Sequence, residues 1–485
     1  MTCNDRIVLV AVFASVSLVC AANSSELEFW QKKADAMKAN VVQSSNLPVS
    51  AIKGTCYYIS SEGSDANDGK SPGQAFATPE RLVKLKLNPG DAVLFRRGDL
   101  YRCKHDIYIP KGVTVSAWGE GPKPVLCGSQ RNYADPSLWQ ETQHPGIWKC
   151  TIPLENIGLI TFNHDPREVG RYDVLCGTLV PPVVDLVKTF KTFDCEPPLQ
   201  LQNDLEFWAD DDKCLYLRST SNPGSRFKRI EIASAINGFY AVEHDLTFDN
   251  LRLTLFGRHG ISGMNNPKNL EVRNCIFDYI GGAILYKKTK TRRNVRYGNA
   301  VEIYGSCSGF RVHNNWIYQI YDTGITHQCV NDPQEITHEN VEYWNNLIEY
   351  CYWSIEYYNK RNKYGITRNV YVHDNFCRFG GEGWGCTLRR RTTPMYSFAH
   401  RADKTENYRT ENNIFQFSEG FILSHKPELE PDGALTFKGN TYIQKSGQMF
   451  AEWGDATIPA EPGAIENFLK NTLKEKDFKL IIIDK

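Results

Sequence analysis

The stretch that decides the fold is FRVHNNWI, residues 310–317, in which apolar and polar side chains alternate up to an asparagine pair. The same pattern returns as VEYWNNLI at 341–348 and as VYVHDNFC at 370–377. It occurs seven times between Leu246 and Tyr442, as apolar, any, apolar, any, Asn, any, any, apolar. The residues at its Asn position are Asn250, Asn274, Asn314, Asn345, Asp374, Asn412 and Gly439.

A two-residue apolar period is typical of a strand with one buried face, and the polar residue after it marks a bend. Units of this size cannot bury their apolar faces alone, but stacked into a coil they share one continuous core. Asparagine tolerates a left-handed backbone, and amides at one turn position can hydrogen-bond along the stack. The repeat therefore predicts a parallel β-helix. A β-sandwich or propeller is the alternative, but intervals of 24 to 40 residues fit coil loops of varied length better.

The net charge of the chain indicates which partners to expect, and its N-terminal residues indicate where the protein is located. The 485 residues include 56 Lys and Arg and 56 Asp and Glu, so the chain lacks the basic field that nucleic-acid binding needs. The apolar segment Ile7–Cys20, followed by Ala21 and Ala22, is typical of a signal peptide. We expect an exported protein, secreted or periplasmic, that leaves the membrane after processing. A buried N-terminal helix or a membrane anchor is the alternative.

Metal and cofactor signals are weak in this sequence. No C-x-x-C pair occurs, so the spacing of a structural zinc site is missing. The acidic stretch 65–69 does not have the acid spacing of an EF-hand, and no Gly-rich phosphate cradle or dinucleotide fingerprint occurs. We therefore expect neither a metal nor a cofactor.

Two further stretches carry a resemblance to a known group. Residues 57–102 include YYISSEGSDAND, GKSPGQAFATPERLVKL and NPGDAVLFRRGDLYR. They resemble the N-terminal strand, capping helix and first coils of right-handed parallel β-helix proteins of the pectate-lyase-like superfamily. Residues 205–233 read LEFWADDDKCLYLRSTSNPGSRFKRIEIA. They resemble part of the β-domain inserted in β-helical glycoside hydrolases of the β-xylosidase and α-fucosidase type.

The resemblance covers about Thr55–Trp453 and implies an all-β fold. That fold is a right-handed parallel β-helix, a solenoid, with a small inserted β-sandwich-like domain and short capping helices. An amphipathic helix at Ala464–Lys476 is expected to close the open end of the coil. The expected units are a signal peptide at 1–22, the N-terminal cap and first coils at 23–129, the inserted β-domain at 130–234, the main coils with the site at 235–453, and the C-terminal cap at 454–485.

The candidate catalytic residues follow from alternation along the strand after each Asn turn. Three successive coils have an aliphatic residue at the buried position: Val301, Ile325 and Ile355. The next residue on each strand must point to solvent, which places Glu302, Thr326 and Glu356 in one outward column. Asp322 lies in the turn that enters the middle strand. Three acids are therefore expected on adjacent coils.

Glycoside hydrolysis needs two carboxyl groups, one that protonates the leaving oxygen and one that acts as nucleophile or base. Glu302 and Glu356 are two strands apart, with about 9.6 Å between their backbones, which suits an inverting enzyme. Asp322 with either glutamate suits the shorter separation of a retaining enzyme, so the stereochemistry stays open. We expect Glu356 or Glu302 as general acid and Asp322 as nucleophile or base.

Polar and aromatic residues that border this column are candidates for substrate binding: Arg258, His259, Tyr297, His327, Gln328, Tyr357, Glu382, Trp384 and Arg389. Aromatic rings are suited to stacking on sugar faces. The loop ILYKKTKTRRNVRY, residues 284–297, is rich in Lys and Arg and precedes Glu302. It predicts recognition of an acidic sugar, with a solvated loop as the alternative.

The leading interpretation is an exported glycoside hydrolase that acts on a plant or algal polysaccharide or oligosaccharide. A first alternative is a polysaccharide lyase for a uronate polymer, in which Lys287, Lys288, Arg292 and Arg296 neutralise the uronate carboxylate. A second is a non-catalytic carbohydrate-binding β-helix. Carbohydrate is the expected partner in all three, and the sequence predicts no oligomeric state.

Overall fold

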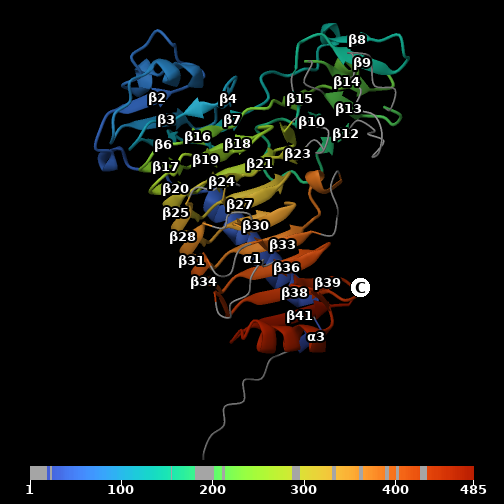
Figure 1. The fold of residues 1–485 in the computed structure, drawn as a ribbon. Coiled ribbons are helices and arrows are strands. Elements are labelled where there is room, and N and C mark those ends of the chain that lie inside the picture. The colour runs from blue at the N-terminus through green and yellow to red at the C-terminus, as the bar shows by residue number, and fades with distance from the viewer. Residues whose placement is uncertain are drawn as a thin grey trace, which may run out of the picture.

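The computed structural model describes most of the chain that follows the predicted signal peptide (Figure 1). Of the predicted signal segment only strand β1 (Val19–Ala21) is described, so the signal peptide stays a prediction. Among the described residues, no helix is long and apolar enough to cross a membrane. The described residues are 19–21, 24–154, 156–180, 201–209, 213–286, 295–329, 335–359, 364–387, 393–399, 404–425 and 434–484.

Three long sheets, named A, B and C, run along the molecule (Figure 1). Each full coil adds one strand to sheet B, then one to sheet A, then one to sheet C, and strands of successive coils pair in parallel. The chain is thus a right-handed parallel β-helix, which confirms the predicted fold class.

The strands of the three sheets have the following bounds. Sheet B contains β2 (Cys56–Ile59), β3 (Ala92–Arg96), β6 (Thr114–Trp118), β17 (Leu246–Asp249), β20 (Leu270–Arg273), β25 (Cys307–His313), β28 (Thr337–Trp344), β31 (Ile366–His373), β34 (Thr405–Glu411) and β37 (Leu435–Lys438). Sheet A contains β4 (Leu100–Arg102), β7 (Val125–Cys127), β18 (Arg252–Thr254), β21 (Ile276–Ile280), β26 (Trp316–Ile320), β29 (Leu347–Glu349), β32 (Phe376–Gly380), β35 (Ile414–Ser418), β38 (Thr441–Lys445), β41 (Lys479–Ile483) and β1. Sheet C contains β5 (Ile107–Tyr108), β16 (Phe239–Ala241), β19 (Ile261–Gly263), β24 (Val301–Tyr304), β27 (Thr323–Gln328), β30 (Trp353–Tyr358), β33 (Pro394–Ala399), β36 (Phe421–His425), β39 (Met449–Trp453) and β40 (Ala456–Pro459).

The main core is the interior of the coil, where inward side chains of all three sheets form one apolar cluster. Val301, Ile325 and Ile355 belong to it and are fully buried, as alternation predicted. Because neighbouring residues on a strand point to opposite faces, the residues that follow them lie on the outside of sheet C. The core therefore determines which side chains reach the outer surface of that sheet.

The turn between sheets B and A has two adjacent asparagine positions with different roles. Asn314 and Asn345, at the first position, have a left-handed backbone with φ of 54° and 51°. The stacked amides belong to the second position, where Asn315 Nδ2 donates to Asn346 Oδ1 at 3.0 Å. The ladder consists of Asn315, Asn346, Asn375, Asn413 and Asn440. The expectation that amides at the first asparagine position hydrogen-bond along the stack was therefore wrong by one residue, because the side chain that enters the coil follows the left-handed one.

Glu475 ends this ladder. Its Oε1 accepts hydrogen bonds from the N–H and the Nδ2 of Asn440 at 3.0 and 2.8 Å. Its Oε2 accepts one from the Tyr442 hydroxyl at 2.8 Å. Burial raises the pKa of the Glu475 carboxyl to about 7, although the hydrogen bonds from Tyr442 and Asn440 act in the opposite direction.

Glu475→Gln is expected to remove a pH dependence from the stability of the coil. The carboxyl contributes fully below its unfolded pKa of 4.5, and this contribution is lost as the pH rises through its folded pKa of about 7. The amide does not ionise, so the variant should gain up to about 3 kcal/mol relative to wild type between pH 4.5 and pH 8. Urea titrations at both pH values measure this gain. An equal difference between the two proteins at both pH values would contradict the prediction.

Helix α1 (Ser24–Val42) lies lengthwise along the outer face of sheet A rather than across an end of the coil (Figure 1). Trp30, Ala34 and Val41 share an apolar cluster there with outward residues of the sheet such as Trp316 and Phe376. The other helical segments among the described residues are short: η1 (Val49–Ala51), η2 (Pro72–Gln74), η3 (Pro79–Lys84), η4 (Pro136–Leu138), α2 (Pro223–Arg226), η5 (Trp384–Thr387), α3 (Pro462–Asn467) and the π-helical η7 (Phe468–Thr472). The helix expected at 464–476 is thus divided between α3 and η7 and ends at Thr472.

Between β7 and β16 the chain leaves the coil and forms two smaller sheets (Figure 1). One contains β8 (Trp139–Glu141), β9 (Ile147–Cys150), β12 (Thr178–Leu179), β13 (Glu206–Ala209) and β14 (Leu215–Arg218). The other contains β10 (Leu159–Phe162), β11 (Leu175–Cys176) and β15 (Ile230–Ala233). Residues of both sheets pack into one separate core, and we call this unit the inserted domain. A hairpin of β22 (Ala283–Tyr286) and β23 (Val295–Tyr297) leaves the coil beside it.

Candidate active site

A cleft of about 570 Å³ opens on the outer face of sheet C, over strands β16, β19, β24, β27 and β30. Its floor is one outward column, in which Ser262 pairs with Glu302, Glu302 with Thr326, and Thr326 with Glu356. Strands about 4.8 Å apart separate the backbones of the two glutamates by about 9.6 Å. The three predicted catalytic residues, Glu302, Asp322 and Glu356, all line this cleft.

Glu302 is held by three side-chain donors. Its Oε1 accepts hydrogen bonds from Ser262 Oγ and His259 Nε2, both at 2.9 Å, and its Oε2 accepts one from Asn299 Nδ2 at 2.8 Å. Burial opposes ionisation, but the His259 side chain and the bonds from Ser262 and Asn299 outweigh it and lower the pKa of the Glu302 carboxyl. Glu302 is therefore a carboxylate at neutral pH, with one lone pair of Oε2 left for a further donor.

The protonation of His259 follows from its backbone contact. The Asn299 N–H donates to His259 Nδ1 at 3.0 Å, so this nitrogen is an acceptor and carries no proton. The ring proton that donates to Glu302 is then on Nε2. Asn299 thus acts twice, once by positioning the imidazole and once by donating directly to the carboxylate.

Glu356 has a different set of neighbours. Its Oε2 accepts hydrogen bonds from Gln328 Nε2 at 2.7 Å and from Thr326 Oγ1 at 3.2 Å. Thr326 lies between the two glutamates in the column, so β27 supplies the donors that orient Glu356. Asp322 lies in the turn that enters β27. Its N–H donates to the Gly298 carbonyl, and its own carbonyl accepts a hydrogen bond from the Trp353 N–H. The cleft thus presents three acids from adjacent coils, and no group of metal-ligating side chains is found among the described residues.

Aromatic side chains form the walls of the cleft: Tyr240, Tyr297, Tyr304, Trp353 and Tyr358. The Tyr297 ring lies edge-on to His259, with 4.8 Å between ring centroids. Such rings offer apolar faces to the C–H groups of a sugar, and their polar ends can reach its hydroxyls.

Four of the predicted substrate-binding residues line the cleft: Arg258, His259, Tyr297 and Gln328. Sequence reasoning did not select Tyr240, Asn299, Trp353 or Tyr358. A signal for Tyr358 was present, because it follows Glu356 by two positions and so shares its face of the strand. Asn299 lies two residues before β24, and Trp353 is the first residue of β30. Alternation along a strand makes no prediction for residues at these positions.

His327 and Tyr357 were predicted to bind substrate, and the structure contradicts this. Both are fully buried inside the coil, because each directly follows an outward residue and must point inward. His327 Nδ1 forms a hydrogen bond of 2.8 Å with the Tyr343 hydroxyl, and the two rings of His327 and Tyr357 stack with centroids 4.9 Å apart. Burial and the neighbouring His338 lower the pKa of His327 well below 6.5, so its ring is neutral.

The structure does not bring Glu382 and Trp384 to the cleft either. The Trp384 N–H and Nε1–H donate to the side chain and carbonyl of Gln319 on sheet A, and its ring packs on Tyr321. The segment therefore turns toward sheet A instead of extending over sheet C. Arg389 and the central residues 287–294 of the basic loop lie outside the described residues.

Comparisons with known proteins add similarity at the level of the fold. No protein-family model and no curated protein matches the sequence. A solved structure described as a glycoside hydrolase is 10% identical, with 89% of this chain and 97% of that chain covered and a TM-score of 0.45. The GH136 lacto-N-biosidase from Eubacterium ramulus is 12% identical, with 95% and 71% covered and a TM-score of 0.39. A rhamnogalacturonan lyase is 11% identical, with 80% and 74% covered and a TM-score of 0.38.

Proposed function

We propose that this protein is an exported glycoside hydrolase that cleaves a plant or algal polysaccharide or oligosaccharide. The observation that carries the proposal is the pair of buried glutamates, Glu302 and Glu356, two strands apart on the floor of a cleft with aromatic walls. A pair separated by two strands leaves space for a glycosidic bond and a water molecule between the carboxyl groups. This spacing favours the inverting reaction.

The contacts of each acid support a division of roles. Glu302 is held ionised by its three donors, and its remaining lone pair on Oε2 is available to accept a proton from an attacking water. Glu356 is oriented through one oxygen by Gln328 and Thr326, and it is the general acid that protonates the leaving oxygen. Asp322 was expected to act as nucleophile or base; it also lines the cleft, and in this division of roles it binds hydroxyl groups of the sugar at the point of cleavage.

A polysaccharide lyase has less support in the described residues. Arg296 was predicted to neutralise a uronate, but its guanidinium donates to the backbone carbonyls of Gly282 and Ile157. The other proposed cations, Lys287, Lys288 and Arg292, lie outside the described residues. These bonds, both from Nη1, anchor the hairpin to the inserted domain, although Arg296 also lines the cleft.

A panel of aryl glycosides and of plant and algal oligosaccharides tests the proposed reaction. We expect release of new reducing ends without an unsaturated product, because hydrolysis adds water across the glycosidic bond. Reducing-sugar release and ultraviolet absorbance are measured on the same samples. Ultraviolet-absorbing products would indicate a lyase, and binding without any cleavage across the panel would indicate a non-catalytic protein.

A further inference from the structure

We propose that the seam between the inserted domain and the coil holds a second carbohydrate subsite, which binds the sugar unit next to the one in the cleft. This inference rests on the proposed function and names the substrate class more closely, as an oligosaccharide of at least two units. A second cavity of about 540 Å³ lies in this seam. Both cavities fall within the range of about 300 to 1,000 Å³ that is usual for small-molecule sites.

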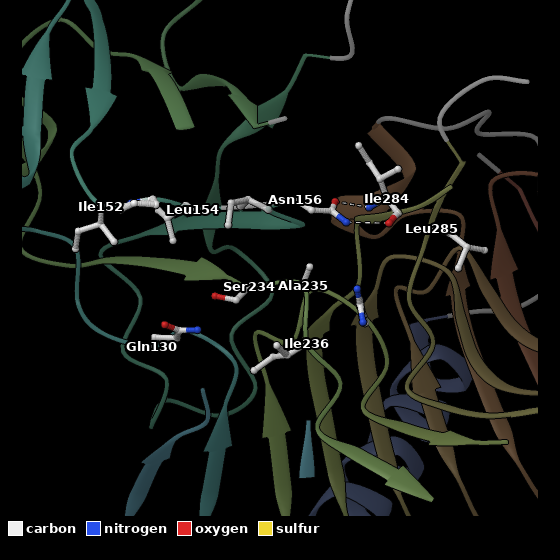
Figure 2. Close-up of a pocket in the computed structure, with 12 residues that line it drawn as sticks. Gln130, Ile152, Leu154, Asn156, Ser234, Ala235, Ile236, Ile284 and Leu285 are labelled. Atoms are coloured by element: carbon white, nitrogen blue, oxygen red, sulfur yellow. Dashed lines mark hydrogen bonds between the residues drawn. The ribbon is translucent and has the colours of Figure 1, made fainter. Parts of the chain in front are cut away.

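The two cavities adjoin each other. Arg258 and Leu285 line both of them, so the two cavities are neighbours at these side chains. In Figure 2, Ile152, Leu154 and Asn156 of the inserted domain form one wall. The opposite wall in the same view comes from a second group: Gln130, Ser234, Ala235 and Ile236.

Direct contacts hold the inserted domain in place at this seam, so the cavity is pre-formed. Asn156 Nδ2 donates to the Ile284 carbonyl at 2.8 Å, and the Ile284 N–H donates to Asn156 Oδ1 at 2.6 Å (Figure 2). A Cβ added at Gly158 would lie 2.2 Å from the Gly281 carbonyl oxygen, so the two backbones touch there. A pre-formed site binds without the entropy loss of ordering its walls.

Two polar atoms at the second cavity have no hydrogen-bond partner among the described residues. Ser234 is 7% exposed, and its buried Oγ has no hydrogen-bond partner in the part of the chain that the structure describes; the same holds for the Nε of Arg258. Buried polar groups are nearly always paired in folded proteins, so such atoms in a cavity wall indicate a ligand or water that supplies the partner. The hydroxyl groups of a sugar can both donate to and accept from these atoms.

The other lining residues are suited to binding a sugar but not to catalysing its cleavage. Ile152, Leu154, Ile236 and Leu285 provide apolar surface for the C–H face of a pyranose. The described lining contains no carboxylate, in contrast to the cleft. The second cavity therefore contributes affinity for a longer substrate, and the reaction stays in the cleft.

The test measures how affinity depends on chain length, in full-length Glu356→Gln protein so that bound sugars are not cleaved. The probes are the mono-, di- and trisaccharide of whichever glycan the wild-type protein hydrolyses. If it hydrolyses none, the probes are those that it binds on an array of plant and algal oligosaccharides. We expect the trisaccharide to bind at least tenfold more tightly than the monosaccharide.

Ala235→Trp fills the cavity and is expected to reduce that advantage to about twofold or less. Ser234→Ala removes only one oxygen and should reduce it by about threefold, which covers the case in which the larger variant does not fold. Ser137→Ala is the matched control, because Ser137 is exposed on the inserted domain and does not line the cavity. It should keep the full advantage.

An advantage that persists in both cavity variants would overturn the inference, as would a wild-type protein that binds no oligosaccharide of two or more units. Length-dependent binding that is lost in Ala235→Trp, in a protein that cleaves no glycan, would refute the proposed hydrolysis and leave the subsite in place. The two proposals can therefore fail separately.

Discussion

Glu302→Gln and Glu356→Gln are each expected to lower kcat by about 10²- to 10⁴-fold, the range that a positioned acid or base contributes. The amide at position 302 cannot take a proton from water, and the amide at position 356 cannot give one to the leaving oxygen. Initial rates on the best substrate of the glycoside panel measure the loss. Because the pKa of Glu302 lies below 4.5, wild-type activity that needs its carboxylate should persist at pH 4.5.

Glu452→Gln is the matched control for these variants. Glu452 continues the same outward column of sheet C, because Glu356 pairs with Ser397, Ser397 with Ser424, and Ser424 with Glu452. It is three strands beyond Glu356 and does not line the cleft. Wild-type kcat in this variant, beside a large loss in the other two, would locate the chemistry in the cleft. Near-wild-type rates in all three would exclude the assigned catalytic residues.

Asn375→Ala is expected to lower the free energy of unfolding by about 3 to 5 kcal/mol, the largest stability effect that we predict. Asn375 Oδ1 accepts from the N–H and the Nδ2 of Asn346, and its Nδ2 donates to the Tyr343 carbonyl and to Asn413 Oδ1. Alanine removes these bonds from the Asn346 N–H and the Tyr343 carbonyl, whereas Asn346 Nδ2 still donates to the Val312 carbonyl and Asn413 Oδ1 still accepts from the N–H of residue 375. Each buried group left unpaired costs about 1 to 3 kcal/mol. Urea-induced unfolding, followed by tryptophan fluorescence, measures the change.

Asn369→Ala is the control for that experiment. Asn369 belongs to an exposed row in which Asn407 Nδ2 donates to Asn369 Oδ1 at 2.9 Å. Its backbone is left-handed, with φ of 55°, so alanine should cost about 1 kcal/mol there, mainly through the backbone. Equal losses of unfolding free energy in the two variants would show that the buried ladder contributes no more to stability than the exposed row.

Alternation along the strands predicted the two catalytic glutamates correctly but did not guide the selection of every substrate-binding residue. The outward positions of Glu302 and Glu356 follow from the fully buried residue before each of them. The same rule excludes His327 and Tyr357 from the cleft, because each directly follows an outward residue and points into the coil. The buried ladder was placed one residue too early, because a left-handed turn residue reverses the side-chain direction that follows it.

The apolar alternation and the turn asparagines are local patterns that repeat along the chain, and they were enough to predict the coil and the outward column of acids. The outward residues that share a cleft, the position of α1 and the second cavity between the inserted domain and the coil became known from the folded structure alone. Those features depend on contacts between residues far apart in the chain, such as Asn156 with Ile284 and His259 with Glu302. The local period carries information about strands and faces but not about the surfaces that later segments bring against them.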